Sequence, residues 1–236
     1  MPLPRALILA AGRGERMRPL SDACPKPLLH VGGKPLIVWH LEALAAAGVR
    51  DVVVNSAWLE AQFPATLGDG SRWGLRITYS MEQRDHGGAL ETAGGIAKAL
   101  PHLAPAKEDV FWVVSGDVLL PRFAFSADAA ARVHRSAALA HLWLVPNAAH
   151  HPHGDFGIDA GTGLATRAAP HHTWASVGLF RAVMFEGVAP DRPMKLRPLL
   201  DAALDASRLS AEMWAGRWVD VGTPERLADA EHAVLP

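Results

Sequence analysis

The sequence predicts an α/β fold with a doubly wound sheet in a single domain. Short apolar runs bounded by turn residues recur along the first half of the chain, as in strands buried on both faces of a parallel sheet. Segments with a helical spacing of apolar residues lie between these runs. The 236 residues contain no repeat, low-complexity tract or linker that would separate two domains.

The predicted elements of the first half alternate between strand and helix. Apolar runs predict strands at 5–10, 51–55, 75–79 and 109–114. Helices are predicted between them, at 35–48, 58–63 and 90–100. The first of these helices has Pro35 in its first turn and Gly48 just past its end. Because strands joined by helices run parallel, a ligand is expected at the carboxyl ends of these strands.

The pattern changes after about residue 137. The run at 137–145, a polar loop and short alternating segments near Phe156, Thr166 and 174–181 predict a mixed extension of the sheet. Two further helices are predicted at 195–206 and 223–234, with a short strand within 216–222 between them. The expected fold is therefore a Rossmann-like, doubly wound mixed sheet in which a part spanning about 1–136 is continued by a part spanning about 137–236.

Composition excludes several classes of partner. The formal net charge of −1 gives no global reason to expect nucleic acid or an anionic membrane. No segment approaches the ~20 consecutive apolar residues of a membrane helix, and the N-terminus lacks a signal-peptide layout. The single cysteine, Cys24, excludes an internal disulfide and fits a reducing compartment, although its place beside a basic loop could lower its pKa. We expect a cytoplasmic protein.

A glycine-rich, basic loop follows the first predicted strand, in the stretch AAGRGERMRPLSDACPKPLL. Glycine lets backbone N–H groups approach a phosphate without interference from a Cβ atom. The dinucleotide template G-x-G-x-x-G fails because Met17 stands where the third glycine is required. The template G-x-x-x-x-G-K-[ST], anchored on Gly33 and Lys34, fails because Pro35 replaces the hydroxyl residue. Neither of the two commonest nucleotide loops is present.

The remaining pattern is G-x-G-x-R-x-x-P-L at 12–20, followed by P-K-P-L at 25–28. This pattern resembles the N-terminal signature of the nucleotidyltransferases that join a nucleoside triphosphate to a sugar 1-phosphate. The resemblance implies the nucleotide-diphospho-sugar transferase type of fold, with catalytic roles for Arg16 and Lys26. It also implies that the nucleotide is bound by the backbone of Ala10, Ala11, Gly12 and Gly14.

The chemistry of such a transfer explains these residue types. Attack by one anion on the α-phosphorus of another is suppressed by repulsion until cations lie on the phosphates. Arg16 can bind phosphate oxygens in a bidentate manner, whereas Lys26 acts as a movable point charge. Pro25 and Pro27 restrict the backbone on both sides of that lysine.

Two aspartates are candidate ligands for Mg²⁺, which prefers oxygen donors. Asp117 follows the predicted strand at 109–114, and Asp220 lies in the stretch RWVDVGTPE. Each alone would also fit a turn or the end of a strand. Both stretches, however, resemble the two metal-binding aspartate motifs of the same family, and two carboxylates leave room for phosphate oxygens and water around the ion.

The segment LETAGG at 90–95 resembles a loop that closes over the base and ribose in this family. The resemblance implies nucleotide binding by Glu82, Glu91, Thr92 and Gly94. Two adjacent glycines lower helix propensity by about 1 kcal/mol each relative to alanine, which indicates close approach of the backbone to a ligand. A plain loop before the helix is the alternative.

Nearly the whole chain resembles one subgroup, the N-acetylmuramate α-1-phosphate uridylyltransferases of peptidoglycan recycling. The resemblance implies Mg²⁺-dependent transfer of UMP from UTP to N-acetylmuramate 1-phosphate, with release of pyrophosphate. It implies sugar binding by Asn55, Asp155, Ser176 and Lys195. The sequence departs from the subgroup in the additional residues at 83–88, at 174–177, and in lacking the E-K-P motif of larger relatives.

Two alternatives remain open from the sequence. Mannose 1-phosphate and GTP are the first alternative pair of substrates, because the departures fall in the base-reading and sugar-side segments. The second is a regulator that binds nucleotide without turnover. No sequence feature indicates the oligomeric state.

Overall fold

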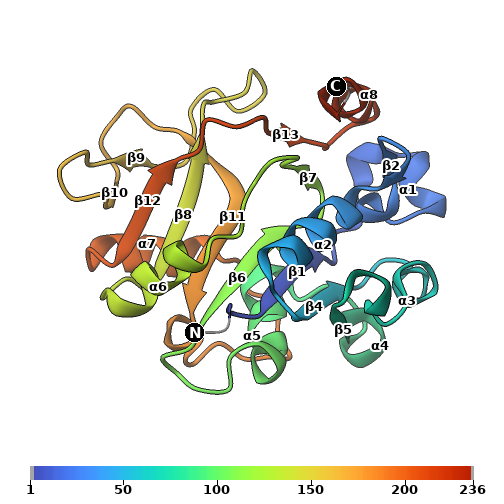
Figure 1. The fold of residues 1–236 in the computed structure, drawn as a ribbon, viewed down its shortest axis with the longest axis horizontal. Helices are drawn as coiled ribbons and strands as arrows, with labels where there is room; N and C mark the ends of the chain where they lie inside the picture. The colour runs from blue at the N-terminus through green and yellow to red at the C-terminus, as the bar shows by residue number, and fades with distance from the viewer. Residues whose placement is uncertain (1–2, 235–236) are drawn as a thin grey trace.

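A mixed sheet of seven strands forms the centre of the molecule, and helices cover both of its faces (Figure 1). The computed structural model describes residues 3–234. The strands are ordered β12-β8-β11-β6-β1-β4-β5, and β11 alone runs antiparallel to its neighbours. These features confirm the predicted α/β class and the mixed, doubly wound sheet.

The bounds of the elements are as follows. The sheet contains β1 (Ala6–Ala10), β4 (Asp51–Ser56), β5 (Arg76–Met81), β6 (Val110–Ser115), β8 (Ala140–Val145), β11 (Thr173–Arg181) and β12 (Leu209–Met213). The short strands are β2 (His30–Val31), β3 (Lys34–Pro35), β7 (Val118–Leu119), β9 (Gly157–Ile158), β10 (Ala165–Thr166) and β13 (Val219–Asp220). The α-helices are α1 (Leu20–Ala23), α2 (Leu36–Ala47), α3 (Gln62–Leu67), α4 (Glu82–His86), α5 (Glu91–Leu103), α6 (Ala127–Arg135), α7 (Arg197–Asp205) and α8 (Pro224–Val234). The 3₁₀ turns are η1 (Glu15–Met17), η2 (Lys26–Leu28), η3 (Ser71–Trp73) and η4 (Ala182–Phe185).

Two hydrophobic cores lie on opposite faces of the sheet. Helices α2, α3 and α6 pack on one face and α5 and α7 on the other. Strand β1 serves both cores because successive side chains of a strand point to opposite faces. Ile8 belongs to the first core and Leu7 to the second, and neither has any exposed surface. This burial on both faces accounts for the continuous apolar run in the sequence.

The sheet reverses its order of growth at β1. The chain adds β4 and β5 on one side of β1, then crosses to the other side to add β6. Ligands of doubly wound sheets bind outside the carboxyl ends of the strands at such a reversal. The residues that meet there are Leu9, Asn55 and Ser115, which are in register on the three adjacent strands.

A third, smaller core brings the C-terminal segment back to the N-terminal part of the chain. Val31, Leu36, Leu119, Val221 and Ala230 are buried together. Strand β13 pairs with β7, and α8 lies beside β2 at the upper right of Figure 1. The last segment of the sequence therefore reaches the carboxyl end of the sheet.

Several predicted elements were wrong in position or missed. The helix predicted at 58–63 is displaced to α3, because Leu59 has a φ of +47°, which a right-handed helix does not allow. Trp58 lies before this turn, and its Nε1 donates to the carbonyl of Ser21 at 2.7 Å. The short strand predicted within 216–222 is present as β13, which pairs with β7 outside the central sheet. Strand β12, which also lies between α7 and α8, was missed.

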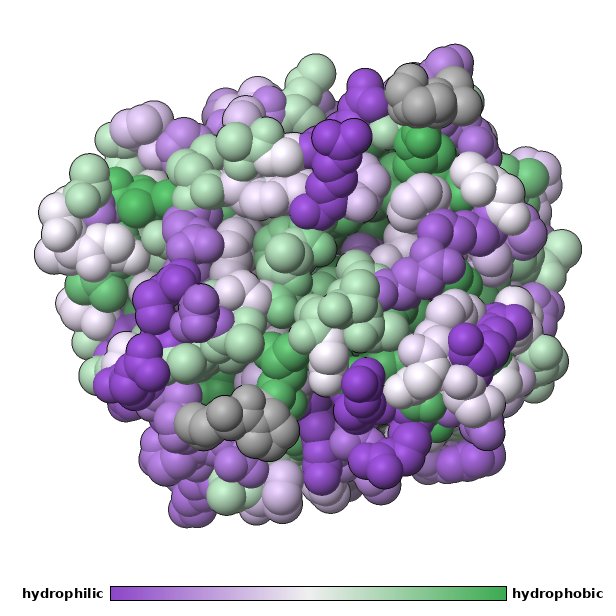
Figure 2. Space-filling model, viewed as in Figure 1, coloured by the Kyte–Doolittle hydropathy of each residue, from purple (hydrophilic) through white to green (hydrophobic). Residues whose placement is uncertain are grey.

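The surface shows no segregation of one residue class on the face seen in Figure 2, where hydrophilic and hydrophobic residues are interspersed. Within residues 3–234, no helix combines the length and apolar character that crossing a bilayer requires.

Candidate active site

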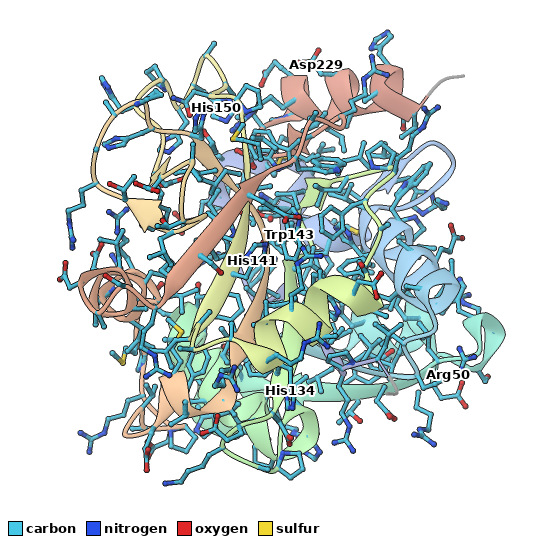
Figure 3. The ribbon with its side chains drawn as sticks, turned by 60° about the vertical axis from the view of Figure 1, so that its left-hand side comes forward. Arg50, His134, His141, Trp143, His150 and Asp229 are labelled. Atoms are coloured by element: carbon cyan, nitrogen blue, oxygen red, sulfur yellow. The ribbon has the colours of Figure 1, made fainter. Side chains whose placement is uncertain are left out.

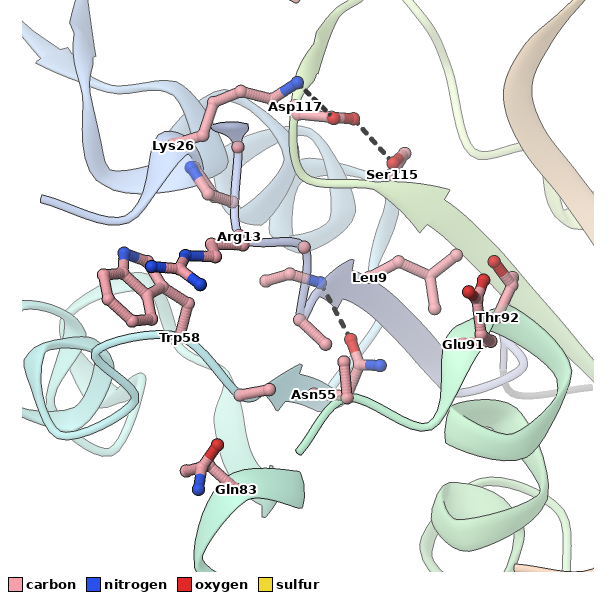
Figure 4. Close-up of a pocket in the computed structure, with 17 residues that line it drawn as sticks. Leu9, Arg13, Lys26, Asn55, Trp58, Gln83, Glu91, Thr92, Ser115 and Asp117 are labelled. Atoms are coloured by element: carbon pink, nitrogen blue, oxygen red, sulfur yellow. Dashed lines mark hydrogen bonds and ion pairs between the residues drawn. The ribbon is translucent and has the colours of Figure 1, made fainter. Parts of the chain in front are cut away.

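A cavity of about 580 Å³ opens at the carboxyl ends of β1 and β6 (Figure 4). Its wall is formed mainly by the glycine-rich loop after β1, the ends of β4 and β6, and the beginning of α5. The lining residues are Leu9, Ala10, Ala11, Gly12, Arg13, Gly14, Lys26, Pro27, Asn55, Ala57, Trp58, Gln83, Ala89, Glu91, Thr92, Ser115 and Asp117.

The structure brings many of the predicted site residues to this cavity. Those that line it are Ala10, Ala11, Gly12, Gly14, Lys26, Asn55, Glu91, Thr92 and Asp117. Those outside the lining are Arg16, Glu82, Gly94, Asp155, Ser176, Lys195 and Asp220. The first group forms the wall of the cavity, and the second group lies outside that wall.

A buried hydrogen-bond network fixes the wall at the ends of β1 and β4. The Asn55 Oδ1 atom accepts a 2.8 Å hydrogen bond from the backbone N–H of Ala10, and Nδ2 donates to Glu82 Oε1 at 2.8 Å. The other Glu82 oxygen accepts from the N–H of Leu90 at 2.7 Å. The network thus joins the loop after β1 to the segment that precedes α5. Asn55, predicted to bind sugar, has both ends of its amide engaged within the protein.

The carboxyl group of Glu82 has no exposed surface. Burial raises its pKa, and the opposing hydrogen bonds from Leu90 and Asn55 only partly reverse this effect. A Cβ atom on Gly95 would lie 2.6 Å from Glu82 Oε1 and 2.7 Å from Asn55 Nδ2. Glycine at this helical position therefore leaves the space that the network occupies.

Gly94 serves a different purpose from its neighbour. A Cβ atom there would collide with the carbonyl oxygen of Arg192. Met194 both accepts and donates at this contact: its carbonyl accepts from the N–H groups of Ala93 and Gly94, and its N–H donates to the carbonyl of Leu90. The beginning of α5 is therefore packed directly against the residues before Lys195.

Lys26 and Asp117 form an ion pair in the wall of the cavity, with 2.6 Å between Nζ and Oδ2. The lysine side chain is 9% exposed and the aspartate 32%. The hydroxyl of Ser115 donates to the second carboxylate oxygen at 2.7 Å. Burial tends to raise the pKa of Asp117, but the Lys26 ammonium and the Ser115 hydroxyl outweigh it and hold that pKa below its usual range.

Asp220 lies next to Asp117 although about a hundred residues separate them. In the β7–β13 ladder Asp220 is opposite Val118, and the N–H of Val221 donates to the carbonyl of Asp117 at 3.1 Å. The Asp220 carboxylate accepts from Arg226 Nη1 at 2.6 Å, and His150 Nε2 lies 3.2 Å from the same oxygen. Figure 3 shows His150 in a loop at the same end of the molecule as α8.

The guanidinium group of Arg16 reaches the same C-terminal segment. Its Nη2 atom lies 3.3 Å from the position that a Cβ atom on Gly222 would take. Arg16 is thus beside the Asp220 segment rather than in the wall of the main cavity.

Two of the predicted sugar-binding residues lie where β11 begins. Asp155 Oδ2 accepts from the N–H of Trp174 at 2.8 Å. The register between β11 and β8 shifts between Trp174 and Gly178, and Ser176 within that bulge has a φ of +59°. A positive φ is costly for a residue with a side chain and is often found at functional positions. Glu91, in the wall of the main cavity, also has a positive φ, of +57°.

The additional residues at 83–88 form most of the short helix α4. The helix is fixed by Asp85, whose carboxylate pairs with Lys98 Nζ at 2.6 Å and with Arg84 Nε at 2.7 Å. Hydrogen bonds from these two side chains hold the pKa of Asp85 far below its usual range. The insertion thereby places the Gln83 side chain at the cavity (Figure 4).

A family model described as nucleotidyl transferase matches residues 5–235. The chain belongs to this family. It is 46% identical over 232 residues to N-acetylmuramate alpha-1-phosphate uridylyltransferase from Neisseria meningitidis, covering 96% of each chain. A mannose-1-phosphate guanylyltransferase from Mycobacterium tuberculosis is 40% identical, over 48% of this chain and 30% of its own. The crystal structure of HddC from Yersinia pseudotuberculosis complexed with GMP-PN superimposes with a TM-score of 0.73 at 17% identity, covering 98% of this chain and 99% of that one.

Nucleotidyltransferases of this family generally use a divalent metal ion. Asp117 and Asp220 fit that requirement, since they offer hard oxygen donors on neighbouring segments: Asp117 directly precedes β7, and Asp220 lies in β13, which pairs with β7. Each is charge-balanced by a cationic side chain of the protein, Lys26 or Arg226. Among residues 3–234 no group of three or more histidine, cysteine or acidic side chains gathers in a way that could hold a metal.

Arg13 and Trp58 line the cavity but were missed from the sequence. The Arg13 guanidinium carbon lies 4.6 Å from the centre of the Trp58 ring, at the left of Figure 4. The sequence AAGRGER did offer a signal for Arg13, because Arg13 is the charged residue that stands between Gly12 and Gly14 in the glycine-rich loop. Trp58 carried none, since a tryptophan after a buried strand is equally consistent with the core. Cys24 differs from expectation as well, because burial raises the pKa of its thiol.

Proposed function

We propose that this nucleotidyltransferase transfers UMP from UTP to N-acetylmuramate 1-phosphate, a step of peptidoglycan recycling, in the cytoplasm. The observation that carries the proposal is the 46% identity to the uridylyltransferase of Neisseria meningitidis, which extends over 96% of both chains. The relatives named for mannose-1-phosphate guanylyl transfer match either 48% of this chain at 40% identity or 94% of it at 29% identity, which makes that pair the less favoured alternative.

The nucleotide occupies the cavity after β1 in this proposal. The backbone of Ala10, Ala11, Gly12 and Gly14 binds its phosphates, which is consistent with the small side chains along that wall. Glu91 and Thr92 bind its ribose and base from the opposite wall. Glu82 and Gly94 lie behind these contacts and hold the wall in position.

The reaction is an in-line displacement. An oxygen of the sugar 1-phosphate attacks the α-phosphorus of UTP, the bond from that phosphorus to the bridging oxygen breaks, and pyrophosphate leaves with the bond's electron pair. No covalent intermediate with the protein is required. Catalysis then consists of positioning and charge neutralisation, to which Lys26 and Arg16 contribute by binding phosphate oxygens.

Mg²⁺, held by Asp117 and Asp220, would supply further neutralisation of the phosphate charge. The low pKa of Asp117 keeps that carboxylate ionised and available as a ligand throughout the neutral range. Lys26 is within reach of phosphate when it leaves Asp117, because it already lines the cavity.

The sugar 1-phosphate binds between the cavity and the second half of the chain. Asp155 and Ser176 offer oxygen acceptors for sugar hydroxyls at the beginning of β11. The lactyl carboxylate of N-acetylmuramate requires a cation, and Lys195 is suitably placed beside the start of α5. Arg197 is a weaker candidate because it already pairs with Asp201 at 3.0 Å.

The experiment is a substrate panel measured by pyrophosphate release. UTP, GTP, CTP and dTTP are each combined with N-acetylmuramate, mannose and glucose 1-phosphates in the presence of Mg²⁺. The expected result is the highest kcat/KM for UTP with N-acetylmuramate 1-phosphate. A preference for GTP with mannose 1-phosphate would refute the substrate assignment, and tight UTP binding without turnover of any pair would indicate a regulator.

A further inference from the structure

Two arginines from opposite ends of the chain meet beside Gly222. Arg16 Nη2 lies 3.3 Å from the position of a Cβ atom on that glycine, and the guanidinium of Arg226 occupies that position itself. Any larger residue at 222 would displace Arg226. Two guanidinium groups at such short range repel each other unless they share an anion.

The anion that Arg226 binds in this structure is Asp220, at 2.6 Å. The carboxylate carries one negative charge, whereas Arg16 and Arg226 together carry two positive charges, and the His150 imidazole lies 3.2 Å from the same oxygen. The cluster therefore has a surplus of positive charge. Arg16 is exposed to solvent, but Arg226 and Asp220 are only 16% and 22% exposed, so water screens the charge of Arg226 incompletely.

The cluster lies at the phosphate end of the cavity. Val221, between Asp220 and Gly222, donates its N–H to the carbonyl of Asp117. Asp117 in turn pairs with Lys26, which lines the cavity (Figure 4). Gln83 and Thr92, which line the cavity elsewhere, come from other elements and lie away from Lys26 and Asp117 in Figure 4. A multiply charged anion placed against Lys26 would thus extend toward both arginines.

We propose that Arg226, together with Arg16, binds the pyrophosphate group of the reaction, that is, the β- and γ-phosphates of the triphosphate and the pyrophosphate that leaves. The assignment rests on the uridylyl transfer proposed above. A diphosphate carries enough charge and enough oxygen acceptors for two guanidinium groups, each of which can bind in a bidentate manner. Arg226 exchanges Asp220 for phosphate when the substrate arrives, which frees a carboxylate oxygen of Asp220.

The backbone of Arg226 is fixed while its side chain makes this exchange. Its N–H donates to Thr223 Oγ1 at 3.4 Å in the first turn of α8, which begins at Pro224. The helix itself is anchored by Ala230 and Ala233 in the third core. Only the side-chain torsions have to change.

The proposal is tested by isothermal titration calorimetry with inorganic pyrophosphate, in EDTA and again with Mg²⁺. Arg226→Gln removes the charge, and Gly222→Ala keeps the charge but displaces the guanidinium group. Arg76→Gln is the matched control, because Arg76 also forms a close ion pair with an aspartate, Asp51, away from the cavity. UMP, which lacks the pyrophosphate group, serves as the second ligand, and circular dichroism verifies folding.

Arg226→Gln is expected to weaken pyrophosphate binding about tenfold or more, as loss of a charge-assisted hydrogen bond does, in EDTA as well as with Mg²⁺. Gly222→Ala weakens it in the same direction, and Arg76→Gln leaves it unchanged. UMP binding stays the same in all variants. A role limited to holding Asp220 would predict no loss in EDTA.

The proposal would be overturned if Arg226→Gln bound pyrophosphate in EDTA with an affinity within twofold of the wild-type value. N-acetylmuramate 1-phosphate is titrated as a third ligand, and a loss confined to its binding would also overturn the proposal, because it would assign Arg226 to the attacking substrate. Wild-type turnover of UTP with that sugar phosphate is measured separately. Failure of turnover refutes the proposed function, whereas intact turnover with unchanged pyrophosphate binding refutes only the role of Arg226.

Discussion

The amide of Asn55 supports the glycine-rich loop after β1, and its removal has a cost that follows from its hydrogen-bond partners. Asn55→Ala leaves the N–H of Ala10 without its acceptor and one oxygen of Glu82 without its donor. An orphaned buried backbone group costs about 1–3 kcal/mol, and a hydrogen bond to a charged group contributes about 1.5–3 kcal/mol. Because Asn55 borders the cavity, water can replace part of the lost hydrogen bonding. We therefore expect the free energy of unfolding to fall by about 3 kcal/mol.

Urea denaturation followed by tryptophan fluorescence measures this loss. Gln62→Ala is the control, because Gln62 also donates a side-chain amide hydrogen bond, at 2.9 Å to the carbonyl of Ala23, but at the surface. Its expected cost is below about 1 kcal/mol. A loss below 1 kcal/mol for Asn55→Ala would show that the network does not hold the loop. UTP affinity provides the second readout, and it should fall because the backbone at Ala10 is no longer fixed.

The remaining predictions concern charge, space and protonation. Lys26→Ala should lower kcat/KM by about 10²–10³, equivalent to the roughly 3 kcal/mol that one preorganised charge contributes, and a decrease of less than tenfold in the pyrophosphate-release assay would contradict this role. Gly95→Ala should destabilise the protein despite the better helix propensity of alanine, because a Cβ atom would lie within 2.7 Å of two polar atoms, whereas Gly88→Ala, in open space, should not; thermal denaturation compares the two. His40 is buried and neutral, with its pKa lowered to about 4 from 6.5, so stability is fully present above pH 6.5 and is lost as pH falls toward 4, by about 3 kcal/mol in total. His40→Gln should flatten this pH dependence of the urea midpoint, and an unchanged slope would rule out His40 as its cause.

Elements with strong local signals were predictable from the sequence. The buried strands β1, β4 and β6 are continuous apolar runs, and α2 has its proline and glycine at its two ends. The glycine-rich loop was recognised because its pattern of glycine, arginine and proline resembles the signature of the nucleotidyltransferase family. These are the parts of the fold in which sequence pattern and structural environment agree.

Elements that depend on distant partners were missed. In β12 only Leu209 and Ala211 face the core, and Ser210 and Glu212 alternate with them, so the apolar signal is short. Helix α4 has no apolar periodicity at all, and it is fixed by the pairing of Asp85 with Lys98. Such contacts join residues that are separated in the sequence, so the pattern of a short segment does not reveal them.

The same limit explains why Arg226, unlike Asp117 and Asp220, was not expected beside the cavity from the sequence. Asp220 comes to Asp117 through the two-residue strand β13, which is too short to be stable alone. The third core supplies the missing stability, since Val221, the next residue, is fully buried against Leu119 of β7 and Ala230 of α8. Helix α8 therefore acts on the site in two ways, by anchoring the segment that carries Asp220 and by supplying Arg226 as the cation that balances it. An aspartate that lacked such a partner would repel the incoming triphosphate, so the paired state keeps the site both stable and receptive to anions.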